Sequence, residues 1–154
     1  EIGQHWQPAP GWWLDLDVAW SKARFRQAQG DVPHAGRRVP GAVERVASFG
    51  LTFDDKGTWT AQLQLRHFGP RDLIEDGSVR SKGTTLACAR LGRKLTPTTR
   101  VHVDVFNLFN RKVSDIDYFY ESRLASEPSG QATAGLHSHP AEPRTVRVSL
   151  VVAF

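Results

Sequence analysis

The stretch that decides the fold is PRTVRVSLVVAF, residues 143–154. From Val146 onward every second side chain is apolar, in the row Val146, Val148, Leu150, Val152 and Phe154. The residues between them are Thr145, Arg147, Ser149, Val151 and Ala153. Alternation with a period of two is produced by a β-strand that has one apolar and one more polar face. These residues therefore predict a strand with one apolar face.

Five further segments upstream show strand-like patterns. Their approximate bounds are residues 12–25, 41–53, 59–68, 83–95 and 100–110. The sequence DDKG at 54–57 predicts a tight hairpin turn, and LTPTT at 95–99 predicts a second turn. The fold class that follows is all-β, an antiparallel up-and-down meander of about six strands.

The connections between these segments alternate in length. The long ones are residues 26–40, 69–82 and 111–142, and the two short ones are the turns just described. In an up-and-down sheet this alternation puts every long connection at one end. Short turns on one side and long loops on the other are typical of outer-membrane β-barrels. The meander is therefore predicted to be a segment of a transmembrane β-barrel.

Composition is compatible with this prediction. The 154 residues are 40% hydrophobic and 23% charged, and the mean hydropathy of -0.40 is also that of many soluble domains. A transmembrane barrel alternates lipid-facing and interior residues, so its mean hydropathy is modest as well. No run of about 18 apolar residues occurs, which excludes a membrane-spanning helix. The net charge of +4 comes from scattered basic residues, so we expect no nucleic-acid partner.

Two features bear on processing and redox chemistry. The chain contains no Met, starts at Glu1 and shows no signal-peptide pattern, so we expect it to be a piece of a longer protein. Its single cysteine, Cys88, cannot form an intrachain disulfide and is expected to be a small apolar residue in a strand.

Four stretches together resemble one protein family. They are VPGAVERVASFGL at 39–51, LRHFGPRDLIEDGSVRS at 65–81, VDVFNLFNRKVSDIDYFY at 103–120 and HSHPAEPRTVRVSLVVAF at 137–154. The most specific elements are Asn107, Leu108, Phe109 and Asn110 after the penultimate strand, followed by the aromatic-ended strand at 154. From about residue 12 to 154 the chain resembles the C-terminal part of the β-barrel of a TonB-dependent outer-membrane receptor.

The resemblance implies a function in transport. Such receptors, located in the bacterial outer membrane, bind scarce nutrients such as ferric siderophores, cobalamin or glycans and import them with energy from the TonB complex. It also implies that Val148, Leu150, Val152 and Phe154 form a barrel-assembly signal. Because these barrels have about 22 strands and a plugged lumen, residues 1–154 are expected to be a C-terminal fragment without the plug domain.

Partners follow from the same resemblance. The expected ones are outer-membrane lipid and lipopolysaccharide, the plug domain and the remaining barrel strands, with TonB reached only through the missing N-terminal part. No cofactor is expected. Arg45 and His67, on the apolar parity next to long connections, are candidates to reach lipopolysaccharide headgroups, and ordinary solvent exposure is the alternative.

The longest connection holds the candidate ligand-binding residues. Tyr118, Tyr120 and Arg123 lie where an extracellular loop would meet a ligand. The aromatic rings could stack on sugars or siderophore catechols, but anchoring of the loop to the barrel rim is the interpretation that we favour. The HxH pair His137 and His139 is a weak metal candidate, because no third ligand has a fixed spacing to it, and we predict no metal site.

Two other polar groups have simple structural interpretations. His102 and Asp104 suggest acid–base chemistry, but alternating polar residues on an interior face explain them more simply. The cluster formed by Arg71, Asp72, Glu75 and Asp76 is expected to be a solvated surface that pairs with itself.

Catalysis is not expected, because the chain has no nucleophile elbow, phosphate-binding glycine loop or paired-carboxylate motif. The alternative to a receptor is a soluble six-stranded β-barrel or sandwich that binds a small ligand. A receptor would turn one apolar row to lipid, whereas a soluble domain would turn the same row into a closed core. That row comprises Trp12, Leu14, Leu16, Val18, Trp20, Leu63, Leu65, Val148, Leu150 and Val152.

Overall fold

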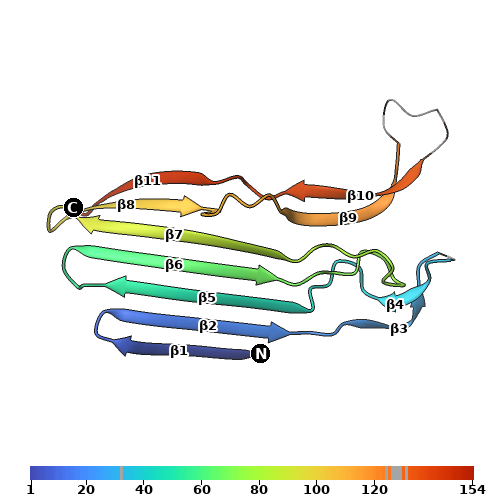
Figure 1. The fold of residues 1–154 in the computed structure, drawn as a ribbon, viewed down its shortest axis with the longest axis horizontal. Helices are drawn as coiled ribbons and strands as arrows, with labels where there is room; N and C mark the ends of the chain where they lie inside the picture. Colours follow the sequence, from blue (N-terminus) through green and yellow to red (C-terminus); the bar gives the residue numbers. More distant parts are fainter. Residues whose placement is uncertain (32, 124, 126–129, 131) are drawn as a thin grey trace.

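The computed structural model describes residues 1–31, 33–123, 125, 130 and 132–154, and these residues form strands, turns and loops (Figure 1). Seven strands make one antiparallel sheet in the order β1-β2-β5-β6-β7-β8-β11. Their bounds are Ile2–Ala9 (β1), Trp12–Trp20 (β2), Arg45–Asp54 (β5), Trp59–Phe68 (β6), Thr84–Lys94 (β7), Thr99–Phe106 (β8) and Thr145–Val152 (β11). The predicted all-β antiparallel meander is confirmed. No helix in the described part of the chain is long and apolar enough to cross a membrane.

The sheet has one strand more than the sequence predicted. β1 pairs with β2, and its register shifts between Trp6 and Ala9. Pro8 interrupts the strand pattern there, and Gln4 interrupts the apolar row. Proline is tolerated at such an irregularity, where the regular ladder is already interrupted. The alternation of β1 is therefore too weak to be read from the sequence.

The alternation of short and long connections is confirmed. Turns at residues 10–11, 55–58 and 95–98 lie at one end of the sheet, here called the turn end. The segments 21–44, 69–83 and 107–144 lie at the other, the loop end (Figure 1). Two of these long segments were expected to be loops but contain hairpins. Segment 21–44 contains β3 (Arg24–Gln29) and β4 (Gly36–Arg38), and segment 107–144 contains β9 (Ser114–Ser122) and β10 (Thr133–Pro140).

The predicted turn at 54–57 is formed by local hydrogen bonds. Asp55 Oδ1 accepts bonds from the backbone N–H groups of Gly57 (2.7 Å), Thr58 (2.7 Å) and Trp59 (3.0 Å). These bonds, with that of Gly57 the largest contribution, lower the pKa of Asp55. Lys56 takes the left-handed conformation at φ 58°. An Asp side chain that bonds the backbone in this way is a common reason for a tight turn.

Strand register gives the sheet one apolar and one polar face. Leu16 pairs with Phe49, which pairs with Leu65, and directly paired residues share a face. Carried across the sheet, this places the whole predicted apolar row on one face. The opposite face carries Asp15, Asp17, Gln62, Gln64, Arg66, His102, Asp104 and Arg147. The prediction that these two sets lie on opposite faces is confirmed.

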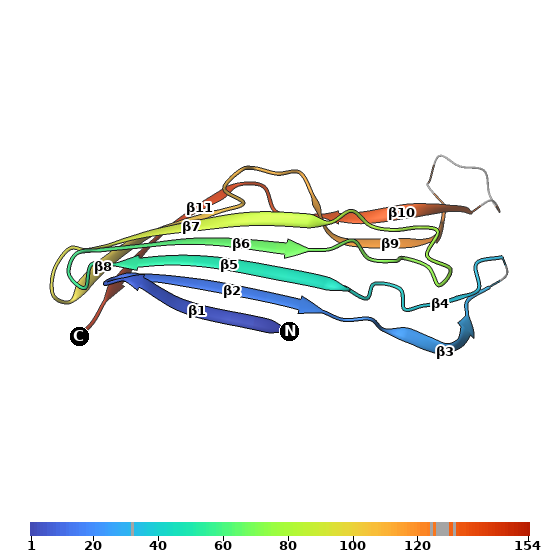
Figure 2. The ribbon, with the colours of Figure 1, turned by 60° about the horizontal axis from the view of Figure 1, so that its bottom comes forward.

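The apolar face is open. Val148 is 68% exposed and Leu150 is 65% exposed. The surface area is 11069 Å², whereas a compact monomer of this mass would expose about 7,800 Å². The sheet is curved and twisted (Figure 2), and β1 and β11 are the two ends of its strand order. The described residues thus form an open sheet and not the closed core of a soluble domain.

Candidate functional site

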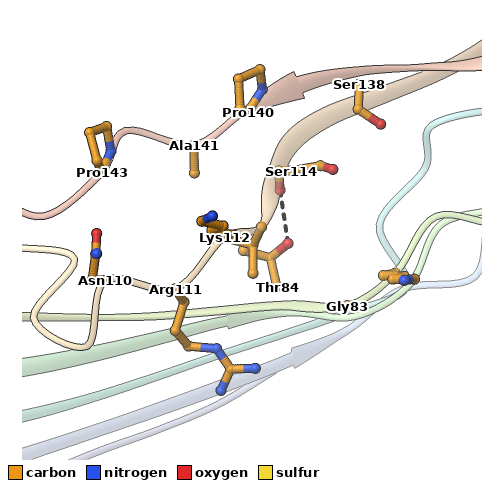
Figure 3. A pocket seen from close by; sticks show the side chains of 12 residues that line it. Gly83, Thr84, Asn110, Arg111, Lys112, Ser114, Ser138, Pro140, Ala141 and Pro143 are labelled. Carbon is orange, nitrogen blue, oxygen red and sulfur yellow. Dashed lines mark hydrogen bonds between the residues drawn. The ribbon is translucent and has the colours of Figure 1, made fainter.

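Two adjoining cavities lie on the polar side of the sheet at its loop end, and together they are called the mouth. The larger has a volume of about 790 Å³ and is bounded by the start of β7 and by the segment 107–144 (Figure 3). Its lining residues are Lys82, Gly83, Thr84, Asn110, Arg111, Lys112, Val113, Ser114, Ser138, Pro140, Ala141 and Pro143. Thr84 Oγ1 donates a 2.9 Å hydrogen bond to the backbone oxygen of Ser114, which fixes one wall to the other (Figure 3).

The second cavity, of about 410 Å³, continues down the polar face. It shares Lys82 and Thr84 with the first. Its other lining residues are Val43, Gln64, Arg66, Phe68, Gly69, Arg71, Leu86, Cys88 and Asp115. Cys88 lies in β7 as expected, but its side chain belongs to the polar face and lines this cavity.

The mouth is positively charged. Its lining contains the cations Arg66, Arg71, Lys82, Arg111 and Lys112, and one carboxylate, that of Asp115. Arg71 is partly engaged, because its Nη2 lies 3.2 Å from the backbone oxygen of Asp115 and 3.9 Å from the carboxylate of Asp117. Grouped cations of this kind raise the local concentration of anions.

The asparagines of the sequence motif hold the wall that carries Arg111. Asn107 is 4% exposed and, like Asn110, has a positive φ, a conformation that asparagine adopts more readily than most residues. Asn107 Nδ2 donates to the backbone oxygens of Arg111 (3.0 Å) and Glu142 (2.9 Å), and its Oδ1 accepts from Arg111 N (2.9 Å). Asn110 Oδ1 accepts from Arg144 N at 3.0 Å. The motif therefore ties the exit from β8 to the return into β11.

The two apolar residues of the motif differ in their environments. Leu108 N donates to the backbone oxygen of Ala87 at 2.8 Å, which extends the pairing with β7 by one bond. Phe109 is 68% exposed. The packing role of the motif thus falls on its asparagines and on the backbone of Leu108.

A network of ion pairs joins the first and second long segments. Asp72 is 5% exposed and lies 2.8 Å from Arg38 Nη1 and 2.9 Å from Arg80 Nε. Arg38 is also 3.9 Å from Glu44, which pairs with Arg24 at 2.7 Å. The hydrogen bond from Arg24 lowers the pKa of Glu44. The expectation that Asp72 belongs to a solvated, self-paired cluster is wrong, because its partner Arg38 comes from another segment and the carboxylate is buried.

Asp76 makes a second link between these segments. Its carboxylate accepts hydrogen bonds from Ser78 N at 2.8 Å and bonds His34 Nδ1 at 2.9 Å. The bond from Ser78, followed by that of His34, lowers the pKa of Asp76 to about 2. Both links lie within the loop end, so the segments 21–44 and 69–83 are held together at two places.

Of the predicted ligand residues, Tyr118 and Tyr120 lie together beside the mouth. They are 56% and 52% exposed and line a further cavity of about 410 Å³ with Arg71 and Leu73. Tyr120 stacks on the ring of His137 at 3.9 Å. Arg123 directly follows β9 and does not line the three cavities described here.

The weak metal candidates, His137 and His139, both lie in β10. His137 Nε2 lies 3.1 Å from Ser122 Oγ, and His139 pairs with Ile116 two residues further along β10. Within the described ranges, no group of three or more His, Cys, Asp and Glu side chains is placed to hold a metal ion.

His102 and Asp104 lie on the polar face of β8 but do not pair with each other. Asp104 is 5% exposed and binds Arg90 Nε at 2.5 Å. His102 Nδ1 is buried and has no hydrogen-bond partner among the described residues. The two residues therefore share the polar face, as the alternation in sequence indicated, whereas the ion pair of Asp104 with Arg90 was not predicted.

Comparisons with known proteins support the fold. No protein-family model and no curated protein sequence matches the chain. Among solved structures, it is similar to the ferric yersiniabactin uptake receptor FyuA from Yersinia pestis, with 21% identity, a TM-score of 0.66 and coverage of 99% of this chain and 22% of the receptor. It is also similar to the ferric-catecholate import receptor Fiu from E. coli K12, with 18% identity, a TM-score of 0.67 and coverage of 97% and 20%.

A third similar structure is the copper transporter OprC, with 18% identity, a TM-score of 0.66 and coverage of 99% of this chain and 22% of OprC. The chain therefore spans about a fifth of the length of each receptor. As the sequence predicted, it has the fold of a segment of the β-barrel of TonB-dependent receptors.

Proposed function

We propose that this chain is the C-terminal part of the β-barrel of a TonB-dependent receptor in the bacterial outer membrane, which imports a scarce nutrient of the siderophore, cobalamin or glycan class. The observation that carries the proposal is the division of the sheet into one apolar and one polar face, with every long segment at the same end. The names of the three similar receptors, which refer to ferric yersiniabactin, ferric catecholates and copper, support transport rather than catalysis.

The apolar face is the surface proposed to contact lipid. Trp12 and Trp20 lie at the two ends of β2 on this face. Eight residues of strand span about 26 Å, or roughly 20 Å along the membrane normal at a tilt of about 45°, which is a little less than the apolar band of a barrel, about 25 Å tall. Both rings are exposed, at 39% and 58%, and tryptophan favours the membrane–water interface. They fit the two aromatic girdles of a membrane barrel.

The polar face and the sheet edges are proposed to meet the rest of the receptor. Carboxylates and cations on this face, among them Asp15, Arg90 and Asp104, suit a wet lumen or a plug domain. β1 and β11 are edges that further barrel strands can pair with. Coupling to TonB would belong to the part of the receptor that lies upstream, and the assembly signal to Val148, Leu150, Val152 and Phe154.

The mouth is proposed as the nutrient-facing surface of this segment. Its five cations against one carboxylate favour a cargo with net negative charge, such as a ferric siderophore, over an uncharged glycan. Tyr118 and Tyr120 lie beside it with exposed rings, so they are placed to contact the same cargo or to support the rim. We also propose Arg123 as a ligand-binding residue, because it directly follows β9, the strand that carries both tyrosines.

Cell fractionation tests the location. An antibody against this chain should detect, in native cells, an outer-membrane band much heavier than 17.2 kDa whose mobility changes on boiling. A soluble band near 17.2 kDa would overturn the proposal in favour of the soluble ligand-binding domain.

Uptake assays test the role of the mouth. In cells that express the complete protein, the double variant Lys82→Gln/Arg111→Gln should lower uptake of an anionic ferric siderophore at least tenfold. Lys94→Gln is the matched control, because Lys94 has the same polar-face parity but lies at the turn end. Equal uptake by both variants would contradict the assignment of the mouth.

A further inference from the structure

We propose that a groove at the loop end of β2 and β5 binds a phosphate group of an outer-leaflet glycolipid. This inference rests on the proposed function for the orientation of the sheet in the membrane. The groove has a volume of about 450 Å³ and is lined by Trp20, Ser21, Lys22, Arg24, Arg38, Glu44 and Arg45.

The groove lies where the apolar face ends. Trp20 and Arg45 are directly paired across β2 and β5, so both belong to the apolar face. The next two pairs on this face towards the turn end are Val18 with Ala47 and Leu16 with Phe49. A lipid whose chains cover these apolar residues has its headgroup next to Trp20 and Arg45. Tryptophan is favoured at this depth of the bilayer, and the exposed fraction of Trp20 is 58%.

The groove has more cations than its own carboxylate can neutralise. Arg24 lies 2.7 Å from Glu44, and Arg38 is shared between Asp72 at 2.8 Å and Glu44 at 3.9 Å. Arg45 and Lys22 form no ion pair with any of the described residues. Lys22 and Arg45 therefore remain available for an anion, whereas Arg24 and Arg38 already form ion pairs.

The wall of the groove is held in place by its own hydrogen bonds. Ser21 N donates to the backbone oxygen of Glu44 at 2.9 Å, and Ser21 Oγ donates to the backbone oxygen of Val43 at 2.9 Å. These bonds fix the chain on both sides of the groove, next to Lys22 and Arg45. A site that is ordered before the ligand arrives loses less conformational entropy on binding. A guanidinium with an ammonium group is a common pair of phosphate donors.

Other positions along the same rim lack this combination. His67, the second predicted headgroup contact, bonds Thr85 Oγ1 through its Nδ1 at 2.8 Å. At β8 and β11 the corresponding apolar-face pair is Val105 with Val146. Arg45 is therefore the predicted contact that the structure supports, and Lys22 joins it.

The test measures binding of lipid A to the complete receptor purified in mild detergent. Bisphosphorylated lipid A is compared with dephosphorylated lipid A, and the variant is Lys22→Gln/Arg45→Gln. Each cation near an anionic surface contributes about fivefold to the affinity. Because the variant loses two cations, we expect it to bind bisphosphorylated lipid A about thirtyfold more weakly. Dephosphorylated lipid A should bind wild type and variant equally weakly.

The matched control is Arg93→Gln. Arg93 also lies on the apolar face beside a tryptophan, with its guanidinium 5.0 Å from the Trp59 ring, but at the turn end. This variant should bind lipid A like the wild type. A mobility change on boiling shows that each variant has folded.

The outcomes separate this inference from the proposed function. A folded outer-membrane receptor whose double variant binds lipid A as tightly as wild type overturns the groove and leaves the proposed function standing. Competition by millimolar inorganic phosphate with no preference for lipid A identifies a free-phosphate site and overturns the lipid assignment. A protein found only in the soluble fraction overturns both.

Discussion

The main sheet and the loop end are stabilised in different ways. In the sheet, large apolar side chains such as Leu150 and Trp20 are 65% and 58% exposed. At the loop end, Leu73 is 6% exposed, Ile74 is 9% exposed and the charged Asp72 is 5% exposed. The sheet is thus a surface with little core of its own, whereas the loop end has a small core and an ion-pair network.

This difference shows which part depends on its surroundings. Backbone groups of the sheet are satisfied by the ladders between its strands, except along the outer edges of β1 and β11. Its exposed apolar side chains gain free energy when an apolar surface covers them, and under the proposed function that surface is lipid. The loop end needs no such cover, because its buried charges and apolar residues pack on one another across three segments. The predictions below separate these two sources of stability.

The largest effect is expected from a charge in the middle of the apolar face. Leu63→Arg should lower the free energy of unfolding by about 2–4 kcal/mol, because a cation near the bilayer midplane is costly on the lipid side of a barrel. Gln64→Arg, one residue away on the polar face, should change it little. Urea unfolding of the complete receptor in lipid vesicles, followed by tryptophan fluorescence, measures both. Equal losses for the two variants would mean that the apolar face does not contact lipid.

A smaller and local effect is expected at the loop end from Asp72→Asn. The variant weakens the pairs with Arg38 and Arg80, whose side chains are 39% and 46% exposed and can be hydrated in compensation. We therefore expect local opening to become easier by about 1–2 kcal/mol.

Amide hydrogen exchange should show this loss of protection in residues 69–83 and in β4, and not in β2 or β5. Glu75→Gln, in the same segment, is the control and should leave exchange unchanged. Global unfolding at lower urea in the Asp72 variant would show that the sheet and the loop end are not independent.

The sequence predicted the sheet well because its strands alternate strongly. One apolar row ends at Phe53 and the next begins at Trp59, which predicted the hairpin and its turn. The pairing of the strands then determined which residues share a face. β1 was missed because Pro8 and Gln4 interrupt its pattern. The hairpins β3–β4 and β9–β10 were missed because they lie inside the long connections that were expected to be loops, although Ile116, Tyr118 and Tyr120 alternate in β9.

The loop-end sites could be predicted only in part. Asn107 and Asn110 were recognised as a motif, but their hydrogen bonds to Glu142 and Arg144 join segments far apart in the chain. Likewise, no local pattern connects Arg38 to Asp72, and none indicates that the cations of the mouth, which come from β6 and two long connections, lie together. Such clusters form only when distant parts of the chain come together. Each short stretch of sequence shows a charged residue but does not indicate its partner.

The smallest effect is a pH dependence at the loop end. Asp76 has a pKa lowered from 3.8 to about 2, chiefly by the hydrogen bond from Ser78 N and then by that of His34. A carboxyl with a depressed pKa in the folded state contributes stability above its unfolded pKa and loses it as the pH falls through the folded value. The link to residue 34 should therefore be intact at pH 4 and weakened near pH 2. Asp55, whose pKa is also lowered, lies in the turn between β5 and β6 at the other end of the sheet and takes no part in this link.

Pepsin cleavage of the complete receptor measures this, because the protease works throughout the interval. The rate of cutting within residues 69–83 should rise from pH 4 to pH 2 more steeply in wild type than in Asp76→Asn, which lacks the ionised acceptor at both values. The ratio of the two rates removes the pH dependence of pepsin itself and that of Glu44, whose pKa is also lowered. A constant ratio would mean that Asp76 does not help to hold this segment to residues 21–44.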